Sequence, residues 1–239
     1  MRDYPYMTAR ASAKKKKLLD QSDYENLLKM QPNEIARRLG EGSYQADIDD
    51  LGSKYEGARL VELALTRNLS RTLSDLVDMS PETLERIIKV YLRRYDILSL
   101  KRLLRWKKSG EKGDIHDLLT PVGSYSYGEL KELSEKTTEE IIEDIEFEDA
   151  EINYSEYLEG KEEISGLETA LDQAYFDELG LLAENTRNKD LKEFIQTEME
   201  HQNIKIALRL KKYGISEEEV EKRMLEIENG KVVDEIVKS

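Results

Sequence analysis

The chain has 239 residues, of which 37% are charged and 7% aromatic, with only 4 Pro and 13 Gly, and this composition is typical of a mostly helical protein of one large or two modest domains. Its formal net charge of -14 argues against nucleic acid as the main partner, because such binding depends on neutralising phosphates. Cysteine is absent, which fits a reducing compartment and excludes disulfides and thiolate metal sites, and no apolar run approaches the roughly 20 residues of a membrane span. With no signal-peptide pattern at the start, we expect any membrane association to be peripheral.

Short helices are expected at the start of the chain. The first, over 4–19, contains the lysine run 14–17, which could serve as a lipid-surface patch but is more often a solvated helix face. A second helix is predicted near 24–29. A third covers 33–39 after Pro32, a residue tolerated at a helix start, and the glycines of 40–43 interrupt the pattern.

Two long helices follow and predict an antiparallel hairpin. Residues 54–77 repeat apolar side chains at steps of three and four, and Ser80 with Pro81 begins a second helix that Gly110 ends. The apolar faces expected to be buried are Val61, Leu65, Leu69, Leu73 and Leu76 in the first helix and Leu84, Ile88, Tyr91, Tyr95 and Leu98 in the second.

The second half begins with an acidic stretch, 139–163, whose interspersed apolar residues favour an amphipathic helix over a disordered tail. A second hairpin is predicted from helices over 164–183 and 189–213, separated by a break at 185–188. Ser216, followed by three glutamates, predicts one more helix start.

The second helix of each hairpin carries a repeated pattern. Residues 90–110 align with 194–214 at an offset of 104, and the echo continues with 118–123 over 225–230. Such a period indicates duplicated subdomains rather than a solenoid. We therefore predict an all-α chain of two pseudo-repeated antiparallel helical-hairpin subdomains, 1–125 and 126–239. The paired signature residues are Asp96, Ser99 and Arg105 in the first copy and Glu200, Asn203 and Arg209 in the second.

Candidates for chemistry are few. Glu198 and His201 have the spacing of a di-iron ligand pair, but that site needs two copies, and His116 has no Glu three residues before it. The carboxylates of 143–151 lack the spacing of a calcium loop. We therefore expect no metal, no cofactor and no catalytic residue. The signature pairs predict polar bonds between helices, because residues three apart share a helix face.

Cations gather at the ends of the two repeated helices. They could offset the helix dipole, and this structural role is favoured by their recurrence, or they could face a partner protein or a membrane surface. The residues concerned are Lys101, Arg102, Arg105, Lys107, Lys108, Lys205, Arg209, Lys211 and Lys212.

These stretches, with the opening YPYMTAR, resemble the C subunit of the archaeal and bacterial A/V-type ATP synthase, the counterpart of the d subunit of the eukaryotic V-ATPase. That family shows a D-x-x-N-L-x-x-L-L-R-x-K pattern. The first copy here keeps Asp96 and Arg105 but has Ser99 in place of Asn, and the second keeps Asn203 and Arg209 but has Glu in place of Asp.

The resemblance implies a non-catalytic part of the complex at the cytoplasmic face of the membrane. It would join the proteolipid c-ring to the D and F subunits of the central stalk. Family members have three similar helical subdomains, and no third copy is found in this sequence. Two alternatives are a ferritin-like metal-binding enzyme, which would need a second histidine-bearing ligand set, and a generic helical adaptor, which would not co-purify with proteolipid and stalk proteins.

Overall fold

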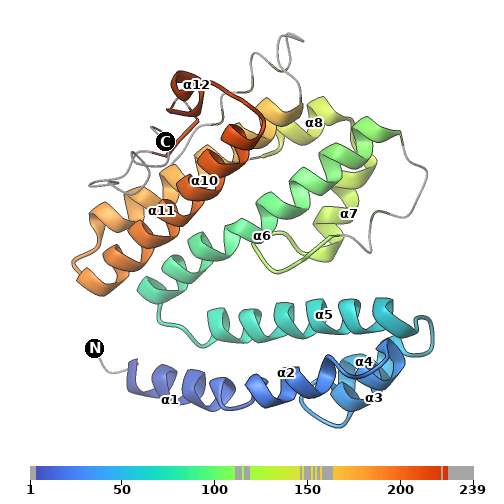
Figure 1. The fold of residues 1–239 in the computed structure, drawn as a ribbon. Coiled ribbons are helices and arrows are strands. Elements are labelled where there is room, and N and C mark those ends of the chain that lie inside the picture. The colour runs from blue at the N-terminus through green and yellow to red at the C-terminus, as the bar shows by residue number, and fades with distance from the viewer. Residues whose placement is uncertain are drawn as a thin grey trace. The chain divides into compact units, whose positions relative to one another are not determined.

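The computed structural model describes residues 4–110, 115, 119–145, 147, 152, 154, 157, 164–221 and 223–225. Among these residues the regular elements are α-helices (Figure 1), which confirms the predicted all-α class. The helices are α1 (Tyr4–Lys15), α2 (Gln21–Leu27), α3 (Pro32–Gly40), α4 (Gln45–Leu51), α5 (Gly57–Asp78), α6 (Glu82–Ser109), α7 (Tyr127–Glu135), α8 (Thr138–Glu143), α10 (Ile164–Asn185), α11 (Lys189–Lys212) and α12 (Glu217–Glu221).

The chain divides into two compact units. The first consists of Met1–Leu103 and Glu111–Ser134, and the second of Leu104–Gly110 and Glu135–Ser239. The last turns of α6 thus group with the second unit, although most of that helix belongs to the first. The predicted domains, 1–125 and 126–239, divided the chain by sequence alone and assigned all of α6 to the first part.

The first unit is built around three mutually packed helices, α3, α4 and α5. Pro32 occupies the first position of α3 as predicted, and the preceding Gln31 N–H donates to the Glu34 carboxylate at 2.8 Å. Helix α4 was not predicted, because its seven residues contain few apolar side chains and follow the glycine-rich break. It covers part of α5, and this contact decides which face of α5 is buried.

The face of α5 that is buried differs from the predicted one. Leu60 and Ala64 are buried, whereas Leu65 and Leu69 of the predicted stripe are exposed. Helix α5 packs mainly on α3 and α4. The prediction that α5 and α6 pack on each other as an antiparallel hairpin is therefore wrong. The polar side chain of Asn68 reaches α4 from the buried side of α5, where sequence patterning expects apolar residues.

Helix α6 buries Leu92, Leu100 and Leu103. Leu98, which was predicted to lie on the buried face, is 39% exposed, because the buried face is centred on residues 92, 96, 99 and 103. The helix ends as predicted at Gly110, whose φ of 66° lies in the left-handed region that glycine adopts without steric cost.

The acidic stretch begins with a short helix in the second unit. Thr137 caps α8 by accepting from the Glu140 N–H at 3.2 Å, and the Glu140 carboxylate accepts from the Thr137 N–H at 2.7 Å. Ile141, Ile142 and Ile145 are buried, so this part of the stretch is folded, as predicted. Most of residues 146–163 lie outside the described residues.

Helices α10 and α11 form the predicted second hairpin and pack on each other. The Asn188 side chain begins α11 by accepting from the N–H groups of Asp190 and Leu191. At the other end Gly214 has a φ of 73°, and the Ile215 N–H donates to the Leu210 carbonyl at 3.1 Å. Helix α12 then packs back on α11 through a cluster of Ile206, Ala207, Leu210 and Val220.

Candidate functional site

Asp96 holds the chain segment that returns to α6. Its side chain is buried, and its carboxylate accepts from the backbone N–H groups of Ser124 at 2.7 Å and Tyr125 at 3.2 Å. Burial raises the pKa of the Asp96 carboxyl above its ordinary value, although the two N–H donors and Arg93 oppose this shift. Asp96 therefore fixes the loop, although burying its carboxylate costs free energy.

Gly123 passes directly over this carboxylate. A Cβ atom added at Gly123 would overlap both oxygens of Asp96. The carboxylate is held by two N–H donors and has little freedom to move away. Sequence analysis placed Gly123 in the repeated loop without a role, and the structure shows that its missing side chain permits the close approach.

Ser99 lies one turn after Asp96 and holds the same segment. Its buried hydroxyl accepts from the Thr120 N–H at 3.0 Å and donates to the Thr120 carbonyl at 3.3 Å. Arg102, one further turn along α6, donates to the Thr120 hydroxyl at 3.1 Å. Three successive turns of α6 thus bind the returning chain between Thr120 and Tyr125.

Asn203 makes the corresponding contact in the second unit. Its buried amide accepts from the Leu225 N–H at 2.7 Å and donates to the Leu225 carbonyl at 2.8 Å. Ser99 and Asn203, which align at the 104-residue offset, therefore each bind both backbone groups of one residue in the segment that follows their helix. By this contact Thr120 corresponds to Leu225, an offset of 105, rather than to residue 227 as in the predicted alignment of the loops.

The signature pairs predicted polar bonds between helices. In the structure, the bonds of Asp96, Ser99 and Asn203 go instead to the backbone of the returning segments. The reason is that a segment without secondary structure needs partners for its own N–H and C=O groups when it is buried. Glu200, which aligns with Asp96, is half-buried, and the residues that would correspond to Ser124 and Tyr125 lie outside the described residues. The pseudo-repeat as a whole stays a prediction.

The two signature arginines occupy different environments near α10. Arg105 forms a bidentate ion pair with Glu168, and the second of its two contacts, from Nη2 to Oε2, measures 2.6 Å. This hydrogen bonding raises the pKa of the Arg105 guanidinium, so it stays charged. Arg209 instead lines a small cavity of about 30 Å³ beside Asp172 and Gln173 of α10. Glu168 was missed by sequence analysis, since no pattern links it to a residue 63 positions away.

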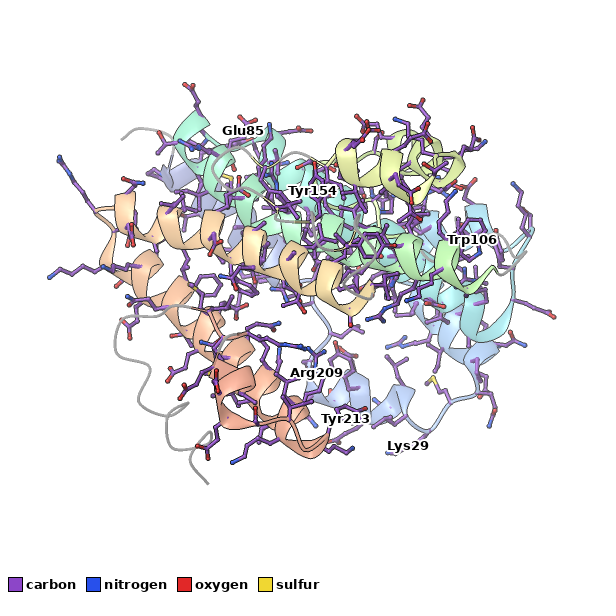
Figure 2. All side chains as sticks on the ribbon, turned by 90° about the horizontal axis from the view of Figure 1, so that it is seen from above. Lys29, Glu85, Trp106, Tyr154, Arg209 and Tyr213 are labelled. Carbon is purple, nitrogen blue, oxygen red and sulfur yellow. The ribbon has the colours of Figure 1, made fainter. Side chains whose placement is uncertain are left out.

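The nine cations at the helix ends separate into two groups. Some are engaged within the chain: Arg102 and Arg105 as described, and Lys107, whose ammonium lies 5.6 Å from the centre of the Trp106 ring. Lys101 and Lys211 also make contacts. Four others are exposed, with no ion pair among the described residues, and Figure 2 shows one of them, Arg209, near the C-terminal part of α11. These four are Lys108, Lys205, Arg209 and Lys212.

Apolar side chains accompany the exposed cations at the end of α11. Leu208 is 56% exposed and Tyr213, labelled in Figure 2, is 74% exposed. Leu208 lies three residues after Lys205 and four before Lys212, so the three side chains share one face of the helix. The combination of cations and exposed apolar groups is suited to a partner surface of acidic character.

The candidate metal pair does not develop into a site in the described part of the chain. His201 is exposed, and no three potential ligands among His, Asp and Glu come together within the described residues. His116 and much of 143–151 lie outside the described residues. The expectations of no metal, no cofactor and no catalytic residue therefore stay predictions.

The chain matches the ATP synthase (C/AC39) subunit family over residues 7–235. It is 37% identical over 229 residues to the C subunit of the A-type ATP synthase of Methanococcoides burtonii, in an alignment that covers 94% of this chain and 64% of that relative. The corresponding protein of Methanosarcina mazei is 35% identical over 223 residues (89% and 60%), and that of Archaeoglobus fulgidus is 33% identical over 221 residues (91% and 64%). The chain thus spans 60 to 64% of the length of these curated relatives. Among the described helices, none combines the length and the apolar character needed to cross a bilayer.

Proposed function

Because the chain belongs to the ATP synthase (C/AC39) subunit family, we propose that it is a non-catalytic coupling subunit in the central stalk of an A-type rotary ATP synthase. In this role it joins the proteolipid c-ring to the D and F subunits of the stalk. It is a peripheral protein at the cytoplasmic face of the membrane, and proton- or sodium-coupled ATP synthesis or hydrolysis proceeds in other parts of the complex.

The observation that carries this proposal is the family match over nearly the whole chain. The buried polar contacts support it physically. A subunit that transmits torque must resist deformation, so its loops must be held as firmly as its helices. Asp96, Ser99 and Asn203 bind the segments that return to α6 and α11, so these loops are fixed by side chains that solvent does not reach.

Co-purification tests the proposal directly. The tagged chain, added to detergent-solubilised membranes of its source organism, is expected to recover the proteolipid and the D and F stalk subunits, identified by mass spectrometry. Recovery of unrelated proteins without any of these three would favour the helical-adaptor alternative. Recovery of none of them, by a chain that is folded by circular dichroism, would reject the coupling role.

The partner surface is assigned to the exposed cations of α11 and tested by charge reversal. Lys205→Glu combined with Lys212→Glu should weaken binding to the complex by about tenfold at low salt, mainly through a slower association rate. The effect should shrink at high salt, which screens exposed charges. Melting should change little, because exposed charges contribute under about 1 kcal/mol each.

A matched control is available at the opposite end of the same hairpin. Arg187→Glu with Lys189→Glu changes the net charge by the same amount, and both residues are exposed. This control should bind like the wild type. Equal losses in the two double variants would show that net charge, and not the end of α11, determines the interaction.

A further inference from the structure

The end of α1 and the short helix α2 expose an unusual set of side chains. Leu28 is 87% exposed, Leu18 67% and Tyr24 55%. Single exposed leucines are common on protein surfaces, but here three large apolar side chains are exposed within one short stretch of the chain. Tyr24 and Leu28 are four residues apart at the end of α2, so they lie on one face of the helix.

Lysines border these apolar side chains on both sides. Lys15, Lys16 and Lys17 precede Leu18, and Lys29 follows Leu28. All four are exposed, and no ion pair of theirs is found among the described residues. Figure 2 labels Lys29 at the end of this segment. The basic–apolar patch is defined as Lys15, Lys16, Lys17, Leu18, Tyr24, Leu28 and Lys29.

The underlying helix is fixed to the first unit by a further lysine. Lys14, whose side chain is only 28% exposed, donates to the Asp75 carboxylate of α5 at 2.8 Å. The next three lysines therefore extend from an anchored helix end. These lysines form a locally basic region in a chain whose net charge is -14.

Three acidic residues, Asp20, Asp23 and Glu25, lie between the lysines; exposed Glu25 accepts from the Gln21 side chain at 3.4 Å, and the other two cap the helix. Asp20 caps α2 by accepting from the Asp23 N–H at 3.0 Å and the Ser22 hydroxyl at 2.7 Å. The Asp23 carboxylate in turn accepts from the Asp20 N–H at 3.1 Å. The carboxylates of Asp20 and Asp23 are directed at the start of α2, where the helix dipole favours negative charge, and they do not pair with the lysines of the patch.

We propose that the basic–apolar patch docks on the surface of a bilayer containing anionic lipids. Lysines in such a surface are attracted to lipid phosphates and can extend past the headgroups to water. Leucine and tyrosine side chains enter the boundary between headgroups and acyl chains. A purely electrostatic contact through lysines would not need these apolar side chains. The patch exposes two leucines, one of them 87% exposed, whereas the end of α11 exposes one leucine at 56%, and this larger aliphatic content favours a lipid surface over an acidic protein partner. The biological placement near a membrane rests on the proposed function, but lipid binding is a property of the isolated chain.

Vesicle flotation tests this proposal without the ATP synthase complex. The purified full chain is mixed with vesicles of phosphatidylcholine alone or of phosphatidylcholine with phosphatidylglycerol. Binding is expected to be several-fold stronger to the anionic vesicles and to fall in high salt. The triple variant Lys15→Gln, Lys16→Gln, Lys17→Gln should lose about tenfold or more in partitioning, since each basic residue near an anionic surface adds to the attraction.

Two further variants separate this surface from other causes. Leu18→Ser with Leu28→Ser should also reduce binding to anionic vesicles, whereas Arg187→Gln with Lys189→Gln, at two exposed residues outside the patch, should reduce it little. Melting curves of all variants should match the wild type. Equal binding of the wild type to neutral and anionic vesicles, or an unaffected triple lysine variant, would overturn the proposal. If the triple variant fails to co-purify with the complex while the wild type ignores vesicles, the patch binds protein instead.

Discussion

At the level of single residues, Asp96, Ser99 and Asn203 take the place of backbone partners for segments without secondary structure. Each is nearly inaccessible to solvent and each binds peptide groups of the returning chain. Removing one partner of a buried hydrogen bond leaves the other unsatisfied, which costs about 1–3 kcal/mol, more than the bond contributes on average. These three side chains therefore have a large effect on the position of the loops that they bind.

Replacement of Gly123 should disturb the Asp96 contact by volume alone. Gly123→Ala is expected to lower the free energy of unfolding by about 1–3 kcal/mol, since the added methyl group overlaps a carboxylate that cannot move freely. Urea unfolding followed by circular dichroism measures the change. Gly128→Ala in α7 is the control, because its Cβ would meet only the Ser126 hydroxyl at 3.8 Å. That control should be neutral or slightly stabilising, and an equal loss in both variants would contradict the assignment.

The raised pKa of Asp96 predicts a pH dependence with a definite sign. Between the ordinary carboxyl pKa and the raised one, the folded protein binds more protons than the unfolded chain, so the contribution of Asp96 to stability falls as pH rises. Asp96→Asn lacks this titration. The stability of the wild type relative to Asp96→Asn should therefore improve as pH is lowered from 7 towards about 4. Denaturant unfolding of both proteins at several pH values measures this difference, and a change in favour of the variant at low pH would contradict the raised pKa.

At the level of helices, α4 and α5 are joined by two ion pairs of different burial. Asp47 of α4 is 1% exposed and accepts from both terminal nitrogens of Arg71, at 3.0 and 2.8 Å, and from Asn68 at 3.0 Å. The other pair, Asp50 with Arg67, lies at the surface. The buried pair explains why a polar side of α5 faces α4, since Asp47 needs donors once it is covered.

The two pairs predict unequal losses on truncation. Arg71→Ala should destabilise the protein by about 2 kcal/mol, because it leaves the Asp47 carboxylate buried without its cation; the half-exposed Arg71 keeps this below the roughly 3–5 kcal/mol typical of fully buried pairs. Arg67→Ala, one turn away on the same helix, should cost under about 1 kcal/mol. Thermal or urea unfolding gives both values. Equal effects would mean that α4 is held by apolar contact and not by Asp47.

At the level of the whole molecule, α6 and α11 make related contacts with the segments that follow them, but the helices that precede them pack differently. Helix α10 packs on α11, whereas α5 packs mainly on α3 and α4. Leu104 is fully buried, and the aligned Leu208 is 56% exposed. The 104-residue correspondence is thus supported by the Ser99 and Asn203 contacts and by glycines of positive φ at 110 and 214, and the hairpins around them are not equivalent.

Metal content is a whole-molecule property that separates the coupling role from the ferritin-like alternative. The untagged chain, dialysed after purification, should retain no stoichiometric iron, manganese or zinc, since Glu198 and His201 form only one ligand pair and a di-iron site needs two. Elemental analysis by mass spectrometry is the measurement. Retained metal that His201→Ala removes would revive the enzyme alternative.

The sequence alone determined the helical class, the positions of α3, α10 and α11, the glycine ends of α6 and α11, and the family resemblance that the family match confirmed. These features depend on local periodicity, capping and motif residues, all of which lie close together in the chain. Tertiary structure decided which face of α5 is buried, where the signature side chains direct their hydrogen bonds, and which cations pair within the chain. Those outcomes depend on residues such as Asp47, Gly123 and Glu168, which come from distant parts of the chain and leave no periodic signal in it.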